Sequence, residues 1–137
     1  MARIKSYTTI EQSRKLAEIL PLESADMCYI KHSSSGKTTW EFNEDFPPMI
    51  LGDISINEIT AETLPCWSLA ALLSIIPQEI FDGEYIINIT EGCNNKWIIT
   101  YDHYENNHSY YGLSTGADNL VDACTDIIIK LKERNII

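Results

Sequence analysis

Two helical patterns bracket three strand patterns between residues 64 and 134, and this order constrains the fold more than any other feature of the chain. The later helical pattern, residues 118–134, has apolar side chains at offsets of 0, 1, 4, 7, 8 and 11. Those offsets trace one face of an α-helix. The residues on that face are Leu120, Val121, Cys124, Ile127, Ile128 and Leu131. The spacing predicts a helix with one buried side.

The earlier helical pattern, residues 65–76, contains no charged residue. Pro65 stands where a helix tolerates proline, in its first turn, and Pro77 ends the pattern. A helix that is apolar on every side must be covered on more than one side. We therefore expect Leu73 to be buried.

Residues 85–90, 96–104 and 110–114 show the alternation and β-branched content of strands. The loop at 92–95 joins the first two as a hairpin. One shared face is predicted to be apolar, with Tyr85, Ile87 and Ile89 beside Trp97, Ile99 and Tyr101. The predicted fold class is α+β: an antiparallel sheet of three or slightly more strands, packed with two main helices, and an N-terminal amphipathic helix.

The N-terminal part predicts a short helix that Pro21 ends, with Thr8 and Glu11 spaced as a capping box. The sequence Gly-Lys-Thr at 36–38 suggests a phosphate-binding loop, but that loop needs glycine where Lys31 stands. Residues 38–42 resemble a strand, so a polar hairpin turn is favoured. Residues 43–62 predict an irregular connection with one strand near 49–51.

The length of 137 residues fits a single domain. Residues 1–63 would hold the N-terminal helix and an irregular acidic segment, and residues 64–137 the core. No apolar run approaches the ~20 residues of a membrane span, and no signal-like apolar stretch follows the basic start. The four cysteines show no C-x-x-C pair, which indicates buried thiols in a reducing compartment. A cytoplasmic protein without cofactor or structural metal is expected.

The formal charge of −10 is concentrated in residues 38–95, which contain ten acidic and no basic side chains. Such a surface repels nucleic acid and anionic membranes. It suits a partner protein that has a basic face. One hypothesis is therefore an acidic inhibitor that mimics nucleic-acid charge and binds a host DNA-handling protein.

A resemblance extends over most of the chain. It is carried by Glu-Gln-Ser-Arg-Lys-Leu at 11–16, Ser-Ala-Asp-Met at 24–27, Pro-Cys-Trp-Ser-Leu at 65–69 with Leu-Leu at 72–73, and Asp-Ala-Cys at 122–124 leading to Lys-Leu at 130–131. In this order the segments resemble small uncharacterised proteins of phages, prophages and mobile elements of gut bacteria. The C-terminal half resembles the phage ABA-sandwich domain. The resemblance implies a fold and supplies no catalytic residues.

The most site-like cluster is Asp102, His103, Tyr104, Glu105 and His108, at a strand end and its loop. A histidine could act as a general base oriented by a carboxylate, or both histidines could bind a metal with Asp102 or Glu105. A small hydrolase or metal-dependent enzyme using His103 and His108 is one hypothesis. A solvated loop explains the same residues.

Aromatic side chains are dense around this loop. Tyrosine is favoured at protein interfaces because it buries a large area at low entropic cost. The leading hypothesis is a non-catalytic accessory protein of a phage or mobile element that binds another protein. The candidate partner surface comprises Tyr101, His103, Tyr104, His108, Tyr110 and Tyr111. The last helical pattern also has charged residues at four-residue spacing: Asp118, Asp122, Asp126, Lys130 and Arg134. They predict a solvated helix face with an ion pair between Asp126 and Lys130. Alternatively, the three aligned aspartates form a row that binds a metal or a partner.

Overall fold

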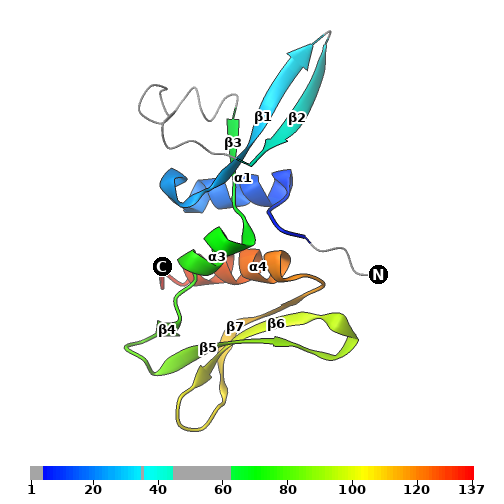
Figure 1. Ribbon diagram of the computed structural model, residues 1–137. Helices are drawn as coiled ribbons and strands as arrows, with labels where there is room; N and C mark the ends of the chain where they lie inside the picture. The colour runs from blue at the N-terminus through cyan, green and yellow to red at the C-terminus, as the bar shows by residue number, and fades with distance from the viewer. Residues whose placement is uncertain (1–4, 35, 45–62) are drawn as a thin grey trace. The chain divides into compact units, whose positions relative to one another are not determined.

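The computed structural model describes residues 5–34, 36–44 and 63–137, which form an α+β arrangement with an N-terminal helix (Figure 1). The predicted fold class is therefore confirmed. The elements in chain order are α1 (Ile10–Ile19), η1 (Leu22–Ser24), β1 (Met27–Ser34), β2 (Lys37–Asn43), β3 (Thr63–Cys66), α3 (Leu69–Ile75), β4 (Glu79–Ile80), β5 (Tyr85–Glu91), η3 (Cys93–Asn95), β6 (Trp97–His103), β7 (Ser109–Ala117) and α4 (Leu120–Glu133).

The chain divides into two compact units, and the division falls inside α3. The first unit is Tyr7–Ala71, and the second is Leu72–Ile137 with the residues that precede Tyr7. The single domain expected from the chain length stays a prediction. The strand expected at 49–51, and four of the ten acidic residues between 38 and 95, lie outside the described residues.

The first unit contains an antiparallel sheet in the order β2-β1-β3. The hairpin of β1 and β2 turns at Gly36, whose φ of 77° favours glycine. The predicted polar hairpin is thus confirmed, and the segment is not a phosphate loop. Pro65 lies in β3 opposite Cys28, at the edge of the described sheet, where a missing N–H is tolerated.

The predicted helix over 65–76 is wrong in its first four residues, because the chain stays extended before Leu69. Asp26 explains the boundary: its carboxylate accepts hydrogen bonds from the backbone N–H and the hydroxyl of Ser68. The Ser68 Oγ in turn accepts from the N–H of Ala71 at 3.1 Å, which caps the new helix. Side-chain capping of this kind competes with helix continuation toward the N-terminus.

Thr8 is fully buried and joins three parts of the first unit. Its N–H donates to the Trp67 carbonyl at 3.0 Å, and its Oγ1 accepts from the N–H of Trp67 at 3.2 Å. The Tyr29 hydroxyl donates to the Thr8 carbonyl at 2.7 Å, and Ser13 bonds the Thr8 hydroxyl. Because the Thr8 side chain is bonded within the core, the next residue, Thr9, caps the N-terminus of α1.

The predicted capping box of Thr8 and Glu11 is therefore displaced by one position. The Thr9 Oγ1 accepts from the N–H of Gln12 at 3.1 Å, and the Gln12 Oε1 accepts from the N–H of Thr9 at 3.0 Å. Helix α1 buries Ser13 and Leu16, whereas Ala17 is exposed.

The second unit contains an antiparallel sheet in the order β4-β5-β6-β7, and α4 packs on β6 and β7 (Figure 1). The three predicted strands are confirmed, and the two-residue β4 was missed. Ile99 and Tyr101 on the predicted apolar face are buried, whereas Ile86 and Ile98 on the opposite face are exposed. Helix α4 buries most of its predicted face: Val121, Cys124, Ile127, Ile128 and Leu131.

Helix α4 begins at Leu120 rather than Asp118, because the Asn119 side chain caps it by accepting from the N–H of Asp122. Asp122 also forms an ion pair with Lys5 at 2.5 Å. The predicted pair of Asp126 with Lys130 is wrong: the Lys130 ammonium donates instead to the Ser114 carbonyl at 2.6 Å. The neighbouring strand thus offers Lys130 a better placed acceptor than its own helix.

Helix α3 buries only one of its seven residues, Leu72. Leu73 is 39% exposed, so its predicted burial is wrong. Alanine and serine occupy much of this helix and require little cover, which is why an uncharged helix can remain partly exposed. No helix in the described ranges is both long and apolar enough to cross a membrane.

Three of the four cysteines, Cys28, Cys66 and Cys124, are buried thiols, as predicted, whereas Cys93 is exposed in the β5–β6 hairpin. Burial raises the pKa of the Cys66 thiol and raises that of Cys124 to about 12. We expect a thiol reagent such as Ellman's reagent to modify one cysteine quickly in the native protein, and all four in urea. Cys93→Ser should abolish the fast reaction; a fast reaction that survives in this variant would contradict the assignment.

Candidate functional site

Two turns meet at one end of the four-stranded sheet. Tyr85 begins β5 and pairs with His103, the last residue of β6. The β4–β5 turn at residues 81–84 and the β6–β7 turn at residues 104–108 therefore lie next to each other. The structure places most of the sequence-predicted cluster here, and it adds residues from the β4–β5 turn that the sequence reasoning missed.

Six rings from these two turns and the adjoining strand ends contact one another. His103 stacks on His108 with centroids 5.3 Å apart and on Tyr104 at 5.0 Å. The Tyr85 ring meets His103 edge-on at 5.3 Å, as expected for aromatic pairs. We call this set the aromatic–histidine cluster: Phe81, Tyr85, His103, Tyr104, His108 and Tyr110.

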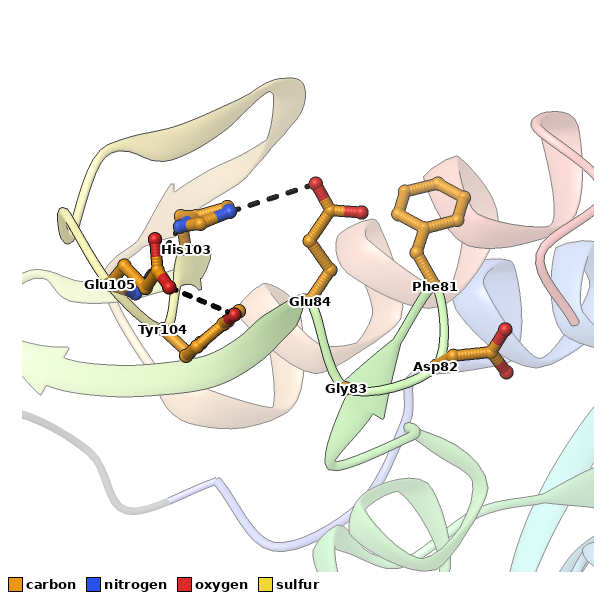
Figure 2. Close-up of a pocket in the computed structure, with 7 residues that line it drawn as sticks. All are labelled: Phe81, Asp82, Gly83, Glu84, His103, Tyr104 and Glu105. Atoms are coloured by element: carbon orange, nitrogen blue, oxygen red, sulfur yellow. Dashed lines mark hydrogen bonds and ion pairs between the residues drawn. The ribbon is translucent and has the colours of Figure 1, made fainter.

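One hydrogen bond and one contact with a carboxylate orient the His103 ring. Its Nδ1 accepts from the N–H of Glu105 at 3.2 Å, and its Nε2 lies 3.6 Å from the Glu84 Oε1 (Figure 2). A general base needs a ring nitrogen that can take a proton from a substrate. Since Nδ1 accepts from an N–H, the neutral ring carries its proton on Nε2, which faces Glu84, and neither ring nitrogen is placed to take a proton from a substrate. His108 is held separately, with its Nε2 3.4 Å from the Tyr85 hydroxyl.

Asp102 lies on the opposite face of the sheet from the histidines. Its carboxylate accepts from the Asn88 amide at 3.0 Å and from the Ser109 hydroxyl at 2.7 Å. Partial burial raises its pKa, but these side-chain hydrogen bonds outweigh that effect and lower the pKa of Asp102. Asp102 therefore cannot orient His103. Within the described ranges, no three His, Cys, Asp or Glu side chains are arranged to hold a metal ion.

Two tyrosines of the predicted partner surface lie outside the cluster. Tyr101 is fully buried and its hydroxyl donates to the Pro77 carbonyl at 2.6 Å, so it belongs to the core. Burial raises the pKa of Tyr101 above its usual value. Tyr111 is 93% exposed in a bulge of β7 opposite Tyr101, where Gly112 adopts a φ of 81°. The bulge explains the exposure, because it turns side chains away from the regular alternation.

An open depression of about 500 Å³ lies between the two turns (Figure 2). Among the residues that the structure describes, its lining combines aromatic rings with acidic side chains and contains no lysine or arginine: Phe81, Asp82, Gly83, Glu84, His103, Tyr104 and Glu105. The Tyr104 hydroxyl donates to the Glu105 Oε1 at 3.1 Å. The lining of the depression is therefore aromatic and acidic.

These residues were only partly accessible to sequence reasoning. His103, Tyr104 and His108 are neighbours in the chain, whereas Phe81 and Glu84 join them through the pairing of β5 with β6. The predicted hairpin of residues 85–90 with residues 96–104 was the signal that could have placed Phe81 and Glu84 at the site, because it brings the start of the first strand next to the end of the second. Comparison with protein-family models, with curated proteins and with solved structures finds no match for this chain.

Proposed function

We propose that this protein is a non-catalytic accessory protein of a phage or mobile element, and that it acts by binding another protein through the aromatic–histidine cluster. The observation that carries the proposal is the placement of Phe81. The residue is 45% exposed, although its backbone has a φ of 54°.

A left-handed backbone is unfavourable for a bulky side chain, and asparagine or glycine avoids most of the strain. Asp82 and Gly83 follow with φ values of 55° and 86°, so the whole turn bends in this way. The ring contacts Tyr85 and Tyr110, but almost half of the residue stays exposed to solvent, so its packing contributes less stability than that of a core phenylalanine. Strain at an exposed residue supports a functional reading, since such conformations concentrate at binding sites.

The cluster is also ordered before any partner arrives. The ring centroids of Phe81 and Tyr110 lie 5.2 Å apart, and those of Tyr110 and Tyr85 lie 5.1 Å apart. The Arg134 guanidinium lies 5.8 Å from the Tyr110 ring centre. Mutual contacts hold the rings in place, so that binding would immobilise few additional side chains. Tyr104, 59% exposed, offers further aromatic area at the same end of the sheet. Exposed, pre-ordered tyrosines are common among the residues that dominate binding energies.

The test separates binding from folding by means of Phe81→Asn. Asparagine accepts a positive φ better than phenylalanine does, so the variant should remain at least as stable as the wild type in thermal unfolding. Capture of a partner from a gut-bacterial host lysate, quantified by mass spectrometry, should fall at least about tenfold in the double variant Phe81→Asn/Tyr104→Ser, as expected when two hot-spot side chains are removed.

The matched control is Ile86→Ser, which removes an exposed apolar side chain from the opposite face of the same sheet. This variant should capture the partner as well as the wild type does. Equal capture by the double variant, or turnover of a substrate that depends on His103, would overturn the proposal.

A further inference from the structure

We infer that the depression between the two turns binds a cationic side chain of the partner, and that the preferred group is the guanidinium of an arginine. This inference rests on the proposed function and adds the chemistry of the partner. It commits to a partner with a basic contact surface.

Charge complementarity is the first argument. Three acidic residues line the depression, Asp82, Glu84 and Glu105, without a lysine or arginine among them. The Glu84 side chain is 54% exposed, and its nearest ionic neighbour, His103, carries a charge only when protonated. At this exposure an incoming cation can reach the carboxylate of Glu84. An acidic partner would meet like charges here, which opposes binding.

The aromatic rings are the second argument, because they favour one kind of cation. Tyr104 stacks on His103 and donates its hydroxyl to Glu105, so one ring and one carboxylate are held next to each other. Figure 2 shows Glu84 reaching toward His103 from the facing turn. A guanidinium is planar, stacks on aromatic faces and donates to carboxylates in pairs. An ammonium provides a point charge and less stacking.

Arginine side chains already lie over aromatic rings at two places in this chain. Arg14 lies 5.8 Å from the centre of the Trp40 ring in the first unit, and Arg134 lies at the same distance from Tyr110. Arginine over an aromatic ring is thus a contact that this protein already uses. In the depression the ring and the carboxylates are present, and the partner would supply the arginine.

The experiment titrates the ¹⁵N-labelled full chain with the peptide acetyl-Gly-Arg-Gly-amide and follows the backbone amide shifts. Saturable shifts are expected at Gly83, Glu84, Tyr104 and Glu105. The citrulline peptide, which has nearly the same shape without the charge, should bind at least about fivefold more weakly, and the lysine peptide should fall between them. Glu84→Gln should weaken the arginine peptide about three- to tenfold. Glu91→Gln, at the other end of β5, should bind like the wild type.

Equal binding of the arginine and citrulline peptides, shifts that do not saturate, or an unchanged affinity in Glu84→Gln would overturn the inference. These outcomes leave the capture experiment untouched. If Phe81→Asn/Tyr104→Ser abolishes capture while the arginine peptide does not bind, the surface is an interface and only its cationic ligand is wrong. If the double variant captures the partner as well as the wild type does, and the arginine peptide does not bind, both proposals fail.

Discussion

Replacing Trp67 by alanine is expected to lower the free energy of unfolding by about 3–5 kcal/mol. The indole is fully buried in the first unit, and its Nε1 donates to the Ser24 Oγ at 2.9 Å. Alanine would remove the packing of the largest fully buried side chain and leave a cavity that the surrounding sheet cannot close. The Ser24 hydroxyl would lose its donor at the same time.

Urea unfolding followed by far-ultraviolet circular dichroism measures this effect. Trp67→Phe serves as an intermediate variant, because it keeps an aromatic ring and removes the donor to Ser24. Trp40→Ala is the matched control: Trp40 is only half-buried on β2 and should cost about 1 kcal/mol. A loss below about 1 kcal/mol in Trp67→Ala would show that the indole does not anchor this unit.

Ile127→Ala is expected to cost about 2–5 kcal/mol, because the side chain is fully buried on the sheet-facing side of α4. Leu73→Ala removes a similar side chain from α3, where 39% of the residue is exposed, and should cost about 1 kcal/mol or less. The sequence pattern predicts similar losses for the two variants, whereas the structure predicts that they differ. Equal losses of unfolding free energy in the same urea experiments would instead support the burial of Leu73 that the sequence pattern predicts.

The second half of the chain was predictable because its signals are local. Helix α4 shows an uninterrupted helical period, and β5 and β6 show an alternation that burial of Ile99 and Tyr101 confirms. The α3 boundary was missed because it depends on Asp26, which is more than forty residues away from Ser68 in the chain. The position of the α1 cap depends in the same way on a distant residue: the N–H of Trp67 donates to the Thr8 hydroxyl, so that Thr9 rather than Thr8 caps the helix.

The candidate site shows the same division. His103, Tyr104 and His108 could be named from one loop, because a polar loop rich in aromatic residues is visible in a single stretch of sequence. Phe81 and Glu84 reach the site only through strand pairing. Asp82-Gly83 is a turn signal, but phenylalanine gives no indication that the left-handed backbone begins at residue 81. Tyr101 is an exception: the alternation of β6 places it beside Ile99 on the apolar face, and only its nearness to the aromatic loop assigned it to the predicted partner surface.

The bulge of β7 has a consequence for how copies of this chain behave at high concentration. In the described part of the chain β7 pairs on one side only, so its other side presents free backbone donors and acceptors. Such an edge invites strands from other molecules and begins aggregation. The bulge opposite Tyr101 breaks the regular repeat of these groups, and Lys130 occupies the carbonyl of Ser114 nearby. A second chain therefore finds no long, regular edge to extend along β7.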